Sequence, residues 1–456
     1  MARLSLCLIA RDEERMLPGC LASVRGLADE VVVVDTGSRD GTREIAVRAG
    51  ARVYDRPWDD DFSAPRNLAL AGATGDWVLQ LDADERLAPG AAAGIRRALA
   101  RRDLDLGLVW IHDAASEEAD PADVVSGRRR HGRPLPAPRL MRRRPGLEYR
   151  GIVHETVEDS LADLGGRLEV LPDVHVAHLG GAPAHRAALA KRERNIALLE
   201  RRRRMEPDAL APVAWLAVEY WLSGRPDEAE RAAAEGWARV DGRSSPIAVH
   251  MLGVSLALAS MRRGDASSAR MVAERLLRAE GRSADAVFLL GHATEAAARA
   301  EPPGGRRREL LEAAERLYQE ALGKRSRPEV YMIVDGADSW GALLRRATVL
   351  LLLERPEEAA AEFRAARLAG ADEGATCLGE LEAMLDAGDA GGALAGLERL
   401  LDARPDGWVL AAAAARALGA REEARLFLAR AAERVPAGFV SNHRAARQAA
   451  MMRDPP

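Results

Sequence analysis

The sequence predicts an α/β domain with a mostly parallel sheet, followed by an all-α region of stacked helical hairpins. Short apolar runs alternate with helical segments up to about residue 110, as in parallel sheets that helices cover on both faces. One run, residues 31–34, is entirely valine, which is typical of a strand buried on both faces. From about residue 186 the chain is rich in Ala, Leu and Arg with helical periodicity.

The expected elements of the first part follow in order along the chain. The strands are expected at residues 4–9, 31–34, 52–54 and 77–81, and the helices at residues 14–24, 42–49 and 63–70. Ser63 is expected to cap the last of these helices. Prolines interrupt the region after residue 111, and strands are expected again at 149–153 and 174–177. We assign this region to the same domain, which gives domains of residues 1–185 and 186–456.

A short joint recurs in the helical part. It combines a Gly or Pro, an acidic or small residue and a closing Ala, and it stands at residues 224–229, 264–269, 355–359, 388–393 and 419–424. The Gly or Pro ends one helix, and an acidic residue suits the N-terminus of the next. The widest gap leaves room for one more unit, which Ala314 is expected to mark. This spacing predicts a solenoid of helical hairpins, with an irregular helical domain as the alternative.

Composition limits the functional classes. The 456 residues include 66 basic and 70 acidic side chains, for a net charge of −4. This near balance gives no indication of a nucleic-acid partner. The cysteines Cys7, Cys20 and Cys377 are too far apart for a disulfide framework or a metal motif and suit a reducing compartment. The N-terminus does not resemble a signal peptide, and no apolar stretch is long enough to span a membrane. A cytoplasmic location is therefore expected.

Two aspartates, Asp82 and Asp84, directly follow the apolar run at residues 77–81. Alternate residues of a strand lie on one face, so both carboxylates are expected on the same side. Ligands of open α/β sheets bind at the carboxyl ends of the strands. Carboxylate oxygens there suit a hard divalent cation, which in turn holds a diphosphate.

Four motifs in this order resemble the family 2 glycosyltransferases of the GT-A fold, whose sheet is Rossmann-like. They lie at residues 6–14, 32–42, 61–67 and 81–85, and the resemblance spans residues 3–180. Asp12 stands where the family usually has Asn, and Pro65 is also unusual. The segments at 149–155, 176–180 and 191–195 resemble a subgroup that adds C-terminal tetratricopeptide-like helices. That subgroup includes the peptide S-glycosyltransferases of glycocin biosynthesis.

The resemblance implies a nucleotide-sugar donor, expected to be UDP-linked, and a divalent cation. Asp84 is expected to bind Mn²⁺ or Mg²⁺, with Asp82 either sharing the metal or contacting the donor. His154 is the expected third ligand, since an imidazole with carboxylates suits these ions. The alternative for His154 is a histidine satisfied within the core.

Further residues are implied to face the donor. Asp35 is expected to accept hydrogen bonds from the base or ribose, and Glu13 to lie beside the nucleotide. Arg66 and Asn67 are expected near the diphosphate. A turn cap is the alternative for Asp35, and a surface ion pair is the alternative for Arg66.

Glu155 is the candidate base for an inverting transfer, which needs a group to take the acceptor's proton. In a strict strand His154 and Glu155 would point to opposite faces, so both serve the site only if the chain turns there. The basic run at residues 142–144 is a candidate lid over the diphosphate.

The acceptor and the sugar stay open. A peptide or protein side chain is one acceptor class, and a cell-envelope saccharide is the other. The apolar helix faces are compatible with a homodimer. A helical-repeat scaffold with an inactive transferase domain is the competing function. A sugar nucleotidyltransferase is disfavoured, because acidic residues 12–14 stand where such enzymes need a Gly-rich, basic loop.

Overall fold

The structure is a computed structural model, and it describes residues 2–181, 185–242, 244–280, 283–324, 334–402, 404 and 406–434. Contacts divide the chain into two compact units, Met1–Arg239 and Val240–Pro456. The last strand ends at His178 and the next long helix begins at His185. The first compact unit extends beyond the predicted boundary at residue 185 and includes three helices that follow the sheet.

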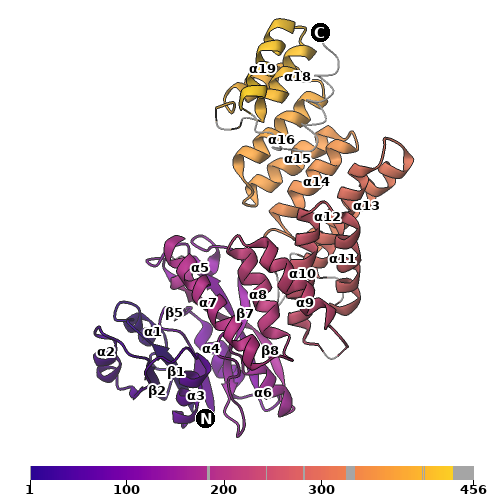
Figure 1. The fold of residues 1–456 in the computed structure, drawn as a ribbon. Coiled ribbons are helices and arrows are strands. Elements are labelled where there is room, and N and C mark those ends of the chain that lie inside the picture. The colour runs from indigo at the N-terminus through magenta and orange to yellow at the C-terminus, as the bar shows by residue number, and fades with distance from the viewer. Residues whose placement is uncertain are drawn as a thin grey trace. The chain divides into compact units, whose positions relative to one another are not determined.

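The first unit contains an eight-stranded sheet in the order β3-β2-β1-β4-β7-β6-β8-β5 (Figure 1). The strands are β1 Leu4–Ala10, β2 Glu30–Asp35, β3 Arg52–Asp55, β4 Trp77–Gln80, β5 Glu85–Leu87, β6 Leu106–Asp113, β7 Leu135–Arg142 and β8 Leu168–His178. Strands β3, β2, β1 and β4 are all parallel, as expected. The other half is mixed, because β7 pairs antiparallel with β4 and β6, and β5 pairs antiparallel with β8.

Both faces of the sheet are buried, as the apolar strands predict. Leu6 and Leu8 of β1 belong to one core and Cys7 belongs to the other, because successive side chains point to opposite faces. The first core is covered by α1 Leu17–Ser23, α2 Thr42–Arg48 and α4 Ala91–Leu99. The second core is covered by α3 Ser63–Gly72 and α6 Glu158–Asp163, while α5 Pro121–Ser126 lies beside β8.

Two local expectations are wrong. Ser63 does not cap α3, because Asp61 Oδ1 accepts hydrogen bonds from the amides of Ser63 (2.7 Å) and Ala64 (3.2 Å). Residues 149–153 do not form a strand. Arg150 and Thr156 make an isolated antiparallel bridge, and the residues between them form a loop.

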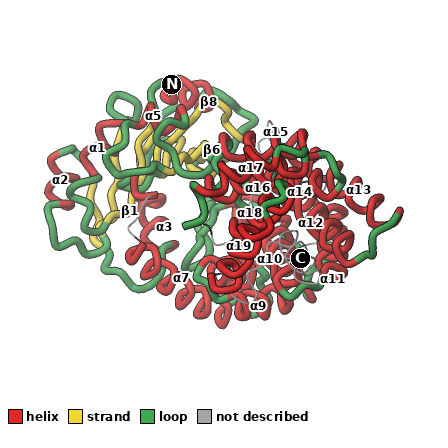
Figure 2. The backbone as a smooth tube through the Cα atoms, turned by 90° about the horizontal axis from the view of Figure 1, so that it is seen from above, coloured by secondary structure: helices red, strands yellow, loops and turns green. Residues whose placement is uncertain are grey.

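The rest of the chain is helical, and Figure 2 shows strands only within the first unit of the described chain. The first unit ends with η1 Leu179–Gly181, α7 His185–Met205, α8 Ala211–Leu222 and α9 Pro226–Ala238. The second contains α10 Pro246–Arg262, α11 Ala266–Glu280, α12 Ala284–Ala300, α13 Gly305–Gly323, α14 Trp340–Leu352, α15 Pro356–Leu368, α16 Glu373–Asp386, α17 Ala390–Glu398, α18 Gly407–Ala417 and α19 Arg421–Arg434. None of the helices described is long and apolar enough to cross a bilayer.

The predicted joints lie between paired helices. Consecutive helices pack as hairpins, with α8 against α9, α10 against α11 and so on to α18 against α19. The expected closing alanines are all buried: Ala229, Ala269, Ala314, Ala359, Ala393 and Ala424. Gly224 and Gly264 adopt positive φ after the first helix of their hairpins, which glycine does without a Cβ penalty. At the joint before α15 the same conformation falls on Glu354, with φ of 60°.

Candidate functional site

The candidate site lies at the carboxyl ends of β1, β2 and β4. These strands are parallel neighbours in the sheet, so the residues that follow them share one edge. Glu13 follows β1, Asp35 ends β2, and Asp82 and Asp84 follow β4. In the strand order these four acidic residues therefore belong to one edge of the sheet.

Asp84 is joined to a histidine that the sequence analysis did not single out. Its Oδ2 lies 3.3 Å from His178 Nε2, and His178 Nδ1 lies 2.7 Å from Asp113 Oδ1. Burial alone lowers the pKa of His178, but the two carboxylates outweigh it and raise the pKa to about 10. The antiparallel pairing of β5 with β8, in which Glu85 is opposite His178, brings this histidine to Asp84.

Position 180, two residues after this histidine, has no room for a side chain. A Cβ at position 180 would lie 2.0 Å from Asp84 Oδ2. The amide of Leu179 also donates a 2.9 Å hydrogen bond to the Asp84 carbonyl. The segment at 178–180 therefore holds both the side chain and the backbone of Asp84.

Arg66 connects two predicted site residues. Its Nε donates to Glu155 Oε1 at 2.5 Å, and its Nη2 donates to Asp82 Oδ1 at 3.0 Å. The guanidinium is buried over the ring of Tyr149, 5.8 Å from its centroid. Its Nη1 is buried with no hydrogen-bond partner in the described structure. Arg66 thus holds a buried ion-pair network, and the surface ion pair considered for it is wrong.

Arg139 of β7 is a second cation in this network, and sequence reasoning missed it. Its Nη2 lies 2.7 Å from Glu85 Oε1 and 3.4 Å from Asp82 Oδ2. Burial raises the pKa of Asp82, but the charges of Arg66 and Arg139 outweigh burial and keep the pKa well below its usual range. Asp82 is therefore an ionised carboxylate held between two arginines.

Glu13 lies in the electric field of the other acidic groups. Burial, followed by the charges of Asp84, Asp82 and Asp40, raises the pKa of Glu13 to about 7. The negative charge at this edge is therefore only partly balanced by the neighbouring arginines.

Asp35 caps the turn that follows its strand. It accepts hydrogen bonds from the amide of Ser38 at 3.2 Å and from the Ser38 hydroxyl. Asp12 also stabilises this turn, because its Oδ1 accepts a hydrogen bond from the amide of Arg39 at 2.7 Å. Asp12 has φ of 56°, a conformation that Asn and Asp tolerate better than most residues. The replacement of the usual Asn by Asp therefore keeps this backbone geometry.

Asn67 faces the backbone of Tyr149. Its Nδ2 donates to the Tyr149 carbonyl at 2.9 Å and its Oδ1 accepts from the Tyr149 amide at 2.7 Å. Asn67 thus fixes the chain that leads to Glu155.

The ring of His154 contacts helix α8, and no contact with the aspartates of the expected metal site is found in the described structure. Its ring stacks on Trp215 of α8, with centroids 3.8 Å apart and planes at 2°. Its Nε2 lies 3.5 Å from Glu219 Oε1. The histidine that the structure places against Asp84 is His178.

The basic run at 142–144 lies at the other end of the sheet. Arg142 pairs with Trp77, the first residue of β4, whereas Asp82 follows the last residue of that strand. Its guanidinium stacks on the Trp77 ring, 4.5 Å from the centroid, and Arg143 donates to the Gly75 carbonyl at 2.9 Å. The lid predicted for this run is therefore wrong.

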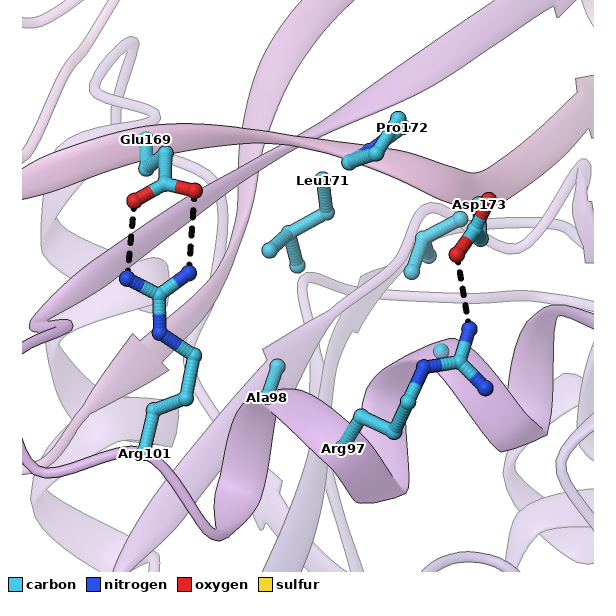
Figure 3. Close-up of a pocket in the computed structure, with 9 residues that line it drawn as sticks. Arg97, Ala98, Arg101, Glu169, Leu171, Pro172 and Asp173 are labelled. Atoms are coloured by element: carbon cyan, nitrogen blue, oxygen red, sulfur yellow. Dashed lines mark hydrogen bonds and ion pairs between the residues drawn. The ribbon is translucent and has the colours of Figure 1, made fainter.

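A hollow of about 290 Å³ between α4 and β8 is separate from this site (Figure 3). Its charged residues neutralise one another, since Arg97 pairs with Asp173 at 2.7 Å and Arg101 pairs with Glu169 at 2.8 Å. It lies toward the start of β8, whereas His178 ends that strand.

Both parts of the chain are similar to known proteins. The family described as glycosyl transferase family 2 matches residues 5–148. A TPR repeat-containing protein of Synechococcus elongatus is 34% identical over 64% of this chain and 69% of its own length. An uncharacterized glycosyltransferase of Rickettsia typhi is 34% identical over 24% of this chain and 37% of its own length. Glycosyltransferase SunS of Bacillus phage SPbeta is 25% identical over 49% of this chain and 50% of its own length.

Proposed function

The chain belongs to the family 2 glycosyltransferases, here joined to tetratricopeptide-like repeats, and we propose that it is a metal-dependent, inverting enzyme that uses a UDP-linked sugar. The observation that carries the proposal is the pair of Asp84 and His178 at the carboxyl edge of the parallel strands, where Glu13 follows the neighbouring strand β1. This is where α/β sheets bind their ligands.

The Asp84–His178 pair suits a divalent cation. No three His, Cys, Asp or Glu side chains in the described ranges already converge as a complete ligand set. Asp84 Oδ2 and His178 Nε2 nevertheless face each other at 3.3 Å, and an imidazole with a carboxylate suits Mn²⁺ or Mg²⁺ when other oxygens complete the shell. We assign the metal to Asp84 and His178 in place of His154, with Asp82 nearby. When bound, the cation supplies positive charge that stabilises the diphosphate leaving group.

The buried arginine supports binding of the diphosphate. Arg66 Nη1 has no hydrogen-bond partner in the described structure although it is buried, and buried donors are rarely left unpaired in a functioning protein. A phosphate oxygen would satisfy it. Asp35 lies at the end of β2, which is next to β1 in the sheet, and is our candidate for the base or ribose. Its turn-capping bonds orient the carboxylate without excluding a further donor.

Glu155 is our candidate for the catalytic base. Its carboxylate is half of the Arg66 ion pair, which fixes its position against the buried guanidinium. As the acceptor attacks the anomeric carbon, Glu155 takes the acceptor's proton, the bond to the diphosphate breaks, and configuration inverts. The chain turns at His154, where φ is 49°, and the adjacent residues 154 and 155 nevertheless have different neighbours, Trp215 and Arg66.

The test is transfer itself. The full chain is incubated with Mn²⁺ and a panel of UDP- and GDP-sugars, and nucleoside diphosphate release is measured with peptide and with saccharide acceptors, followed by mass spectrometry of the acceptor. A hexose added to a peptide or protein supports the acceptor class of the glycocin subgroup. A product on a saccharide assigns the cell-envelope class instead. Absence of release and of donor binding by folded protein would support the scaffold alternative.

A further inference from the structure

The loop at residues 151–155 joins the candidate base to the helical hairpin that follows the sheet. Arg150 and Thr156 close the loop, with hydrogen bonds of 2.9 and 3.1 Å between their backbones. Two residues within it have positive φ, Gly151 at 92° and His154 at 49°. Such backbone angles are costly outside glycine and persist where surrounding contacts enforce them.

Helix α8 supplies one set of these contacts. The His154 ring lies flat on Trp215, and its Nε2 faces Glu219 at 3.5 Å. Glu219 is itself buried and fixed, because Asn195 Nδ2 donates to it at 2.9 Å and Arg192 lies 3.3 Å away. The imidazole is therefore held on its face by Trp215, and its edge faces Glu219 without a hydrogen bond from Nε2 in the described structure.

Helix α7 supplies a second set. Arg202 is buried, and its Nη1 donates to the carbonyls of Val153 at 2.9 Å and His154 at 3.4 Å. The Nε of Arg202 also donates a hydrogen bond to Glu206 Oε1 at 3.1 Å, which orients the guanidinium. A Cβ at Gly151 would lie 2.2 Å from the Arg202 guanidinium carbon, so the glycine is needed both for its φ and for this close approach.

The last residue of the loop, Glu155, reaches the candidate site. Glu155, the residue after His154, lies 2.5 Å from Arg66, which bonds Asp82. Two consecutive side chains therefore connect the helical hairpin to the acidic edge of the sheet.

We propose that the α7–α8 hairpin is a positioning element of the active site, in which Trp215, Glu219 and Arg202 hold the loop so that Glu155 faces Arg66. This inference rests on the proposed function, and it assigns a role in the reaction to helices outside the sheet. Small displacements of a reacting group reduce rates strongly, so loosening the loop should lower turnover more than donor affinity.

The test combines kinetics with hydrogen exchange. The variants are Trp215→Ala, the conservative Trp215→Phe, His154→Ala and the Trp215→Ala/His154→Ala double variant. Trp221→Ala on the same helix is the control, since Trp221 is half-buried and has no ring contact with His154 in the described structure. Nucleoside diphosphate release from UDP-glucose, with water as acceptor, gives kcat and KM. Amide exchange of residues 151–157 reports the loop without requiring activity.

The expected result is a fall in kcat of about 10-fold for Trp215→Ala with donor KM within about twofold. Trp215→Phe should recover most of the rate, and the double variant should lose no more than the worse single variant, because coupled residues are not additive. Exchange at 151–157 should rise in Trp215→Ala and stay unchanged in Trp221→Ala.

An unchanged exchange rate, or multiplicative losses in the double variant, would overturn the positioning role. Faster exchange in Trp215→Ala, together with no binding of nucleotide sugar by the wild type, would support the contacts that hold the loop but refute the proposed function. The two failures are therefore distinguishable.

Discussion

The Nε2 atom of His178 lies 3.3 Å from the Asp84 carboxylate, and its Nδ1 lies 2.7 Å from Asp113 Oδ1 on the other edge of the ring. This arrangement resembles the carboxylate–histidine pairs that orient ligands in metal sites. In the absence of metal, the proton on the imidazole balances the charge of Asp84. A cation that takes its place must displace that proton, so metal affinity should increase with pH.

Replacing His178 by Gln should change how stability depends on pH. The folded-state pKa of about 10 lies above the ordinary 6.5. The ion pairs therefore stabilise the metal-free protein fully below pH 6.5, and this contribution is lost as pH rises toward 10. The melting temperature of His178→Gln should fall well below wild type at pH 6 and approach it by pH 10. The exposed His131→Gln is the control, and an equal deficit at both pH values would contradict the ion-pair account.

Replacing Gly180 by Ala should weaken metal binding. The new methyl group would lie 2.0 Å from Asp84 Oδ2, so the carboxylate must move away from His178. Displacing an oriented ligand typically costs about 10- to 100-fold in metal affinity, measurable by titration with Mn²⁺. Gly323→Ala is the matched control because a Cβ there meets nothing within 4 Å. Unchanged Mn²⁺ affinity in Gly180→Ala would remove Asp84 from the metal site.

Replacing Arg66 by Ala should destabilise the fold. The change leaves Asp82 and Glu155 without their shared partner, and breaking such a buried pair costs about 3–5 kcal/mol. Arg97→Ala is the control, because the Arg97–Asp173 pair is more than 60% exposed and should contribute less than about 1 kcal/mol. Chemical denaturation compares the two. Similar losses in the free energy of unfolding for Arg66→Ala and Arg97→Ala would show that the Arg66 ion pairs contribute no more than an exposed pair.

Replacing Glu155 by Gln should abolish transfer and keep donor binding. The amide retains the shape of the side chain but cannot take a proton, and loss of general base catalysis lowers rates by about 10²- to 10⁴-fold. The control is Glu148→Gln, whose exposed carboxylate pairs with Arg150 instead. Calorimetry with the nucleotide sugar and a transfer assay are run in parallel. Full transfer by Glu155→Gln would remove it from the base role and leave Glu13 as the next carboxylate to test.

The parallel half of the sheet was predictable because its strands are buried on both faces and appear as continuous apolar runs. The mixed half was not, since β5 and β8 pair across a long stretch of chain and such pairings leave no local pattern. His178 was missed for this reason. Its position in a His-x-Gly segment was visible in the sequence, but only the pairing with Glu85 shows that it lies beside Asp84.

The segment at 149–153 was predicted as a strand because Tyr149, Ile152 and Val153 are residue types enriched in strands. The positive φ angles of Gly151 and His154 depend on contacts from Arg202 and Trp215, which belong to the helices that follow. The helical joints, in contrast, were predictable, because glycine, proline and acidic residues act locally at helix ends.

The most direct test of the central claim is calorimetric binding of UDP- and GDP-sugars to wild type and Asp84→Ala, first with Mn²⁺ and then with a chelator. The account predicts binding of one donor that requires the metal and is lost in Asp84→Ala, with both proteins equally folded. Donor binding that survives both the chelator and the loss of Asp84 would contradict a metal site on Asp84 and His178.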